Sequence, residues 1–127
     1  MGSQQRTGSP VLVPLAAEID MSNCEQVCDQ LSVAFIGGAP VVIADFTLTT
    51  FCDCATLRRL LDIQRQAAAA SHAELRVAVP LVSPVRRIMH MTGLDEQFQL
   101  YPTAAHAAAA FPALVPRIPA PPILEVS

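Results

Sequence analysis

The chain has 127 residues, of which 52% are hydrophobic and 15% charged, and its formal net charge is −3 at pH 7. This length fits one domain with a substantial core, and the negative charge excludes the basic surface that nucleic-acid binding requires. No apolar run reaches the ~18–20 residues that span a bilayer, and residues 1–8 lack the apolar core of a secretion signal, so we expect a soluble, cytoplasmic protein.

The first part of the chain predicts a strand followed by a helix. Residues 1–9 are polar and contain two glycines, which favours a flexible tail. Residues 11–20 hold an extended apolar segment, and Pro14 favours an edge position there because it cannot donate a ladder hydrogen bond. Ser22 and Glu25 form the pattern of a capping box, with Ser22 as N-cap. The apolar stripe behind them includes Cys24 and Cys28, which we interpret as core residues.

The central part of the chain predicts a buried strand, a short loop and a second helix. Residues 40–46 are apolar and β-branched, and leucines recur at helical spacing from Leu57 onward. We expect the helix to begin near Asp53 or Cys54, with Asp53 as its cap, and to end near residue 70. A helix start presents unpaired N–H groups and the positive end of the helix dipole. This stretch is therefore a candidate site for an anion.

The remaining pattern continues the alternation of strands and helices. Residues 74–79 and 98–101 read as strands, Ser83-Pro84 starts a helix that Gly93 ends, and a last helix covers about 104–111. Residues 112–127 contain five prolines and predict an extended tail. We therefore predict a single α/β domain over residues 10–111, with a mixed or parallel sheet of four to five strands and about four helices.

Four segments of this pattern resemble STAS domains of the anti-sigma factor antagonist type. They are Glu18-Ile19-Asp20 before the first helix, the strand 42–46 with the loop Phe51-Cys52-Asp53-Cys54-Ala55-Thr56-Leu57, the third helix from Ser83 to Ile88, and Met91-Thr92-Gly93-Leu94-Asp95 with Phe98. The resemblance covers about residues 11–111. It implies a STAS-like domain that binds a protein partner, an anti-sigma factor that is itself a kinase, and that regulates transcription by partner switching in a bacterium.

The resemblance also implies a switch, and this chain departs from it. In the family, the kinase phosphorylates the serine that follows the loop aspartate, and a phosphate adds nearly two negative charges that break the complex. Here Cys54 occupies that position, followed by Ala55 and Thr56, while Asp20 and Asp53 keep the family pattern. Four arginines on the adjoining helices are candidate partner contacts: Arg58, Arg59, Arg86 and Arg87.

Three hypotheses fit the altered loop. The partner is retained and the switch is lost, unless a nearby hydroxyl on Thr49, Thr50 or Thr56 takes the phosphate, in which case a PP2C-type phosphatase is also expected. Alternatively, oxidation of Cys54, with Cys52 as resolving thiol, replaces phosphorylation. The third hypothesis is a metal site made from Cys24, Cys52, Cys54 and a carboxylate or His, and the spacing of these ligands is poor for such a site.

Other functions of the family stay open. STAS domains also serve as subunits of lipid-transport ABC systems and as stressosome scaffolds, and both roles are protein binding. Catalysis is not expected, because His72, His90 and His106 are scattered and the only Gly-Gly pair ends a helix and does not begin one. We accordingly expect a binding protein without cofactor or metal, and not an enzyme.

Overall fold

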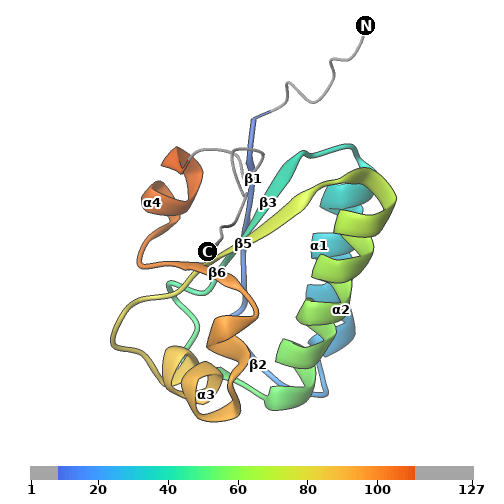
Figure 1. The fold of residues 1–127 in the computed structure, drawn as a ribbon. Coiled ribbons are helices and arrows are strands. Elements are labelled where there is room, and N and C mark those ends of the chain that lie inside the picture. Colours follow the sequence, from blue (N-terminus) through green and yellow to red (C-terminus); the bar gives the residue numbers. More distant parts are fainter. Residues whose placement is uncertain (1–8, 111–127) are drawn as a thin grey trace, which may run out of the picture.

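The computed structural model describes residues 9–110, so the predicted C-terminal tail and nearly all of the predicted N-terminal tail lie outside it. Strands and helices alternate along most of the chain (Figure 1). The strands are β1 (Val11–Pro14), β2 (Glu18–Ile19), β3 (Val41–Asp45), β4 (Phe51–Cys52), β5 (Glu74–Ala78) and β6 (Gln99–Tyr101). The helices are α1 (Cys24–Ile36), α2 (Cys54–Ser71), α3 (Pro84–Thr92) and α4 (Ala104–Ala109), with a 3₁₀ turn η1 (Leu94–Glu96) after α3.

The strands form one main sheet and one small sheet. The main sheet has the order β1-β3-β5-β6, and all of its strand pairs are parallel. β2 and β4 form a separate parallel pair, in which Ile19 is opposite Cys52. The α/β fold class, the four helices and the mainly parallel sheet of four strands confirm the prediction.

β1 lies at the edge of the main sheet, as Pro14 predicts. The N–H of Leu15 donates to the carbonyl of Asp45 on β3 at 3.0 Å. Because successive residues of a strand alternate in direction, the nitrogen of Pro14 faces away from β3. The missing N–H therefore costs no ladder hydrogen bond, and it also makes this edge a poor template for another strand.

Helices cover both faces of the main sheet, with α1 and α2 on one face and α4 on the other (Figure 1). The larger core cluster joins α1, α2, α3 and one face of the strands, and the smaller one joins Val41, Ile43 and Ala78 to Ala107 of α4. The first four residues of β3 are all buried. A strand that is covered on both faces requires such a continuous apolar run, whereas a half-exposed strand alternates.

The predicted capping box at Ser22 is wrong. α1 begins at Cys24, its N-cap is Asn23, and no side chain caps it. The Asn23 side chain is used elsewhere: it accepts from the N–H of Asp20 at 3.0 Å and donates to the carbonyl of Glu18 at 2.8 Å. Both the N–H and the hydroxyl of Ser22 donate to the Asp20 carboxylate. The side chains of Ser22 and Asn23 therefore bind within the loop before α1 and do not cap the helix.

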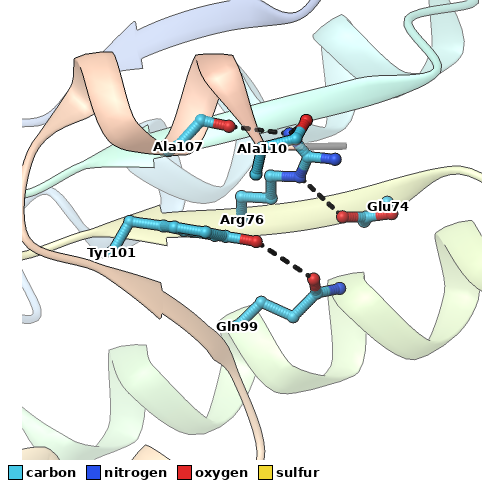
Figure 2. Close-up of polar contacts among 6 residues, drawn as sticks. All are labelled: Glu74, Arg76, Gln99, Tyr101, Ala107 and Ala110. Carbon is cyan, nitrogen blue, oxygen red and sulfur yellow. Dashed lines mark hydrogen bonds and ion pairs between the residues drawn. The ribbon is translucent and has the colours of Figure 1, made fainter. Parts of the chain in front are cut away.

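Arg76 of β5 is a buried cation on the α4 face of the sheet, with 1% of its surface exposed. Figure 2 shows its guanidinium between Glu74 and the end of α4. Nε donates to Glu74 at 2.6 Å, and one terminal nitrogen donates to the carbonyls of Ala107 at 2.7 Å and Ala110 at 3.0 Å. Its carbon Cζ also lies 5.9 Å from the centre of the Tyr101 ring. These contacts tie the C-terminal end of α4, whose carbonyls have no helical partner, to the sheet.

Candidate protein-binding site

The candidate site lies where β4 turns into α2, beside the end of β2. The N–H of Asp53 donates to the carbonyl of Ile19 at 3.1 Å, which holds the start of α2 against the residue before Asp20. The Asp53 side chain is the N-cap of α2 and accepts from the N–H of Thr56 at 2.9 Å. The predicted helix start and cap are therefore found, and the backbones that carry Asp20 and Asp53 are neighbours.

The residues after Asp53 differ in their access to solvent. Cys54 is the first residue of α2 and is half-buried, and Ala55 is exposed. Thr56 has 0% exposure, and its hydroxyl has no hydrogen-bond partner in the described part of the chain. A protein that approaches the N-terminus of α2 therefore meets Cys54 and Ala55, and not Thr56.

The other two candidate hydroxyls are also held by the fold. Thr49 is 3% exposed and its hydroxyl donates to the carbonyl of Ala16 at 2.8 Å. Thr50 is exposed, and its hydroxyl lies 3.2 Å from the carbonyl of Ala17. Of the three threonines, Thr50 is thus the one that an enzyme could reach.

Asp20 follows β2 and is exposed. Its carboxylate accepts from the hydroxyl of Ser22 at 2.6 Å and from the N–H of Ser22 at 2.8 Å. These two bonds favour the ionised form, so the pKa of Asp20 is lower than the ordinary value of a carboxyl. Asp20 therefore contributes a fixed negative charge beside the start of α2.

The four cysteines are free thiols that differ in burial. Cys24, Cys28 and Cys52 are buried and Cys54 is half-buried. Burial raises the pKa of Cys28 to about 11, and burial followed by the charge of Asp53 raises the pKa of Cys52 to about 12. Cys52 is therefore protonated near neutral pH and is poorly suited to attack an oxidised Cys54. Within residues 9–110, no group of three or more His, Cys, Asp or Glu side chains could hold a metal ion.

The four candidate arginines fall into two groups. Arg58 and Arg87 are exposed, and so is Arg59, which lies 3.5 Å from both the Cys24 sulfur and a carboxylate oxygen of Glu25. Arg86, in contrast, is half-buried, and its guanidinium donates to the carbonyls of Val79 at 2.8 Å and Pro80 at 3.3 Å. Its charged group therefore supports the β5–α3 connection.

Sequence reasoning missed the apolar side chains that are exposed next to this site. Leu48 lies in the β3–β4 connection, and Leu81 and Val82 lie in the β5–α3 connection. The signal was present in the sequence, because residues 46–52 and 79–85 contain no charged residue. Exposed apolar residues in an uncharged loop are typical of interaction surfaces.

The chain was compared with protein families and with curated proteins. The family model described as "Mlab, STAS domain" matches residues 3–102. No curated protein matches the chain. Among the described residues, no helix has both the length and the apolar character needed to cross a membrane.

The fold is similar to that of several solved structures. An anti-sigma factor antagonist from Mycobacterium paratuberculosis superimposes with a TM-score of 0.68 at 23% identity, over 84% of this chain and 86% of that one. The anti-sigma factor antagonist SpoIIAA in its unphosphorylated form gives 0.61 at 23% identity, over 82% and 89%. Phosphorylated SpoIIAA from Bacillus gives 0.55 at 23% identity, over 82% and 92%. With the family model covering most of its length, this chain belongs to the STAS domain family.

Proposed function

We propose that this chain is a protein-binding STAS domain of the anti-sigma factor antagonist type, which acts in a bacterial cytoplasm on an ATP-binding anti-sigma factor. The observation that carries the proposal is the position of Cys54. It is the first residue of α2, accessible at the helix N-terminus and flanked by the Asp53 cap. This is the position at which the family resemblance places the phosphorylated serine.

A thiol at this position changes the regulation of the complex. An ordinary serine kinase does not phosphorylate a thiol, and Thr49 and Thr56 are buried. The chain is therefore not released by phosphorylation at residue 54. Of the three neighbouring threonines only Thr50 is exposed, and its hydroxyl donates to the carbonyl of Ala17. Oxidation of Cys54 is a weaker explanation, because the pKa of Cys52 is raised to about 12 and a resolving thiolate is scarce.

The experiment combines the purified chain with a purified ATP-binding anti-sigma factor from the same genome and with ATP. We expect a complex by calorimetry and no phosphate on the wild-type chain by intact-mass spectrometry. Cys54→Ser should acquire one phosphate and lose the complex, and Cys54→Ala, which lacks an acceptor, should behave as wild type. Absence of a complex with every such anti-sigma factor of that genome would refute the proposal.

A second candidate is the subunit of a lipid-transport ABC system. It is favoured by the description of the matching family model, which names MlaB and not an anti-sigma factor antagonist. Both functions use a surface that binds an ATPase, so the fold does not separate them. The same calorimetry with a purified ABC ATPase subunit distinguishes the two, because each candidate predicts binding to one ATPase and not to the other.

A further inference from the structure

Four large apolar side chains are exposed in the two segments that follow the adjacent strands β3 and β5. Leu48, in the β3–β4 connection, is 77% exposed, and Phe51, in β4, is 44% exposed. Leu81 and Val82, in the β5–α3 connection, are 70% and 95% exposed. We call these four residues the apolar loop pair. Such a group is a signal of interaction when its members are close together.

The fold brings the two connections together. β3 and β5 are adjacent and parallel, with Asp45 opposite Ala78, and the N–H of Phe46 donates to the carbonyl of Ala78 at 2.8 Å. β4 also contacts α3, the helix into which the second connection leads. Figure 1 shows both connections at the end of the sheet where α3 lies. Phe51 is two residues from Asp53, so the apolar loop pair adjoins the start of α2.

The apolar loop pair is uncharged, and one of its two connections is anchored at its start. The guanidinium of Arg86 holds the carbonyls of Val79 and Pro80, at the start of the second connection. Residues 46–52 and 79–85 contain no charged residue, although 15% of the residues in the chain are charged. A partner therefore gains apolar burial here without desolvating a charged side chain.

We propose that the partner protein of the α2 surface also places an apolar segment on the apolar loop pair; this inference rests on the proposed function. Two other occupants fit less well. Four side chains, of which Phe51 is less than half exposed, cover less than the ~800 Å² per partner that a stable interface buries, so the contact extends over the start of α2. A second copy related by a twofold axis would then bring Asp20 and Asp53 close to their own copies. An anionic lipid surface repels a chain of net charge −3.

The test uses the double variant Leu81→Ser, Val82→Ser and a matched control, Val33→Ser, Ile36→Ser. The control side chains are 66% and 84% exposed on the C-terminal half of α1, away from the site. Affinity is measured by calorimetry against the anti-sigma factor or ABC ATPase that binds the wild-type chain. We expect about tenfold or greater weakening for the loop variant and less than about twofold for the control. Equal melting temperatures of the variants establish that the fold is retained.

The outcomes separate this inference from the proposed function. If the wild-type chain binds neither ATPase, both fail. If it binds and the loop variant binds equally well, the inference alone fails. Sedimentation velocity and pelleting with phosphatidylglycerol–phosphatidylethanolamine vesicles complete the test. Dimerisation or vesicle binding that the loop variant loses, without a change in affinity for the ATPase, would assign the apolar loop pair to a second copy or to a membrane.

Discussion

Cys54 and Cys52 are two residues apart, yet the fold gives their thiols different chemistry. Cys54 is the first residue of α2 and is accessible, whereas Cys52 is the last residue of β4 and is fully buried in the larger core cluster. Burial disfavours the thiolate of Cys52, and the nearby carboxylate of Asp53 disfavours it further. At the residue scale, the thiol of Cys54 is thus available to a partner, whereas the thiol of Cys52 is part of the core.

The raised pKa of Cys52 predicts a loss of stability at alkaline pH. The folded-state pKa of about 12 exceeds the pKa of an unfolded thiol, so protons bind Cys52 more tightly in the folded state. The stability is therefore unaffected below pH ~9 and falls as the pH rises toward 12. We expect Cys52 to account for about 2 kcal/mol of the decrease in unfolding free energy between pH 8 and pH 10.5. Urea denaturation of the wild type and of Cys52→Ala at both pH values measures it. An equal decrease in both proteins would contradict the assignment.

Asp20 gives a second prediction for a single residue. The hydroxyl and N–H of Ser22 lower the pKa of Asp20, so Ser22→Ala, which removes the hydroxyl, should move that pKa upward. A carboxyl-detected NMR titration of both proteins measures the midpoint for Asp20. An unchanged midpoint would mean that the Ser22 hydroxyl does not hold the charge beside α2.

At the element scale, helix starts were largely predictable from sequence because capping is local chemistry. Asp53, Ser83 and Thr103 each cap the expected helix through the side chain, at α2, α3 and α4. The predicted cap at Ser22 was wrong for an equally local reason, because the Ser22 hydroxyl donates to the carboxylate of Asp20 and not to α1.

The cap of α2 can be tested by its effect on stability. Asp53→Ala removes the acceptor of the Thr56 N–H and should lower the unfolding free energy by about 1 kcal/mol, whereas Asp53→Asn retains an acceptor and should cost less. Ser83→Ala, which uncaps α3, should lower the unfolding free energy by a similar amount. If Asp53→Asn proves as destabilising as Asp53→Ala, the cap is not what Asp53 contributes.

At the scale of the whole molecule, sequence predicted the layers but not what joins α4 to them. Arg76 alternates with apolar residues along β5, a pattern that is typical of a strand with one face exposed to solvent. In a sheet covered on both faces there is no such side, and the small alanines of α4 leave room for a long side chain. The uncharged loops of the candidate site were visible in the sequence, but their proximity was not, because they follow the paired strands β3 and β5, whose opposite residues, such as Asp45 and Ala78, are 33 positions apart.

Arg76 predicts that stability and recognition can be separated across the molecule. Arg76→Met removes the buried guanidinium that pairs with Glu74 and holds the end of α4, and it should lower the unfolding free energy by about 3–5 kcal/mol, with faster hydrogen exchange in α4. Adding Glu74→Gln should recover part of that loss. Because Arg76 lies on the α4 face and contacts that helix, affinity for the partner should stay within about twofold at temperatures where the variant is folded. Uniform exchange throughout the domain, with no preference for α4, would contradict the role of Arg76 as its anchor.

The most direct test of the account places a charge at residue 54 and measures affinity. Glutamate is favourable in the first turn of a helix, so Cys54→Glu and its uncharged match Cys54→Gln should both fold. By calorimetry with the anti-sigma factor, or with the ABC ATPase if that is the partner, we expect Cys54→Glu to bind at least about tenfold more weakly than Cys54→Gln. Equal affinities for the two variants and the wild type would mean that the partner does not contact the start of α2.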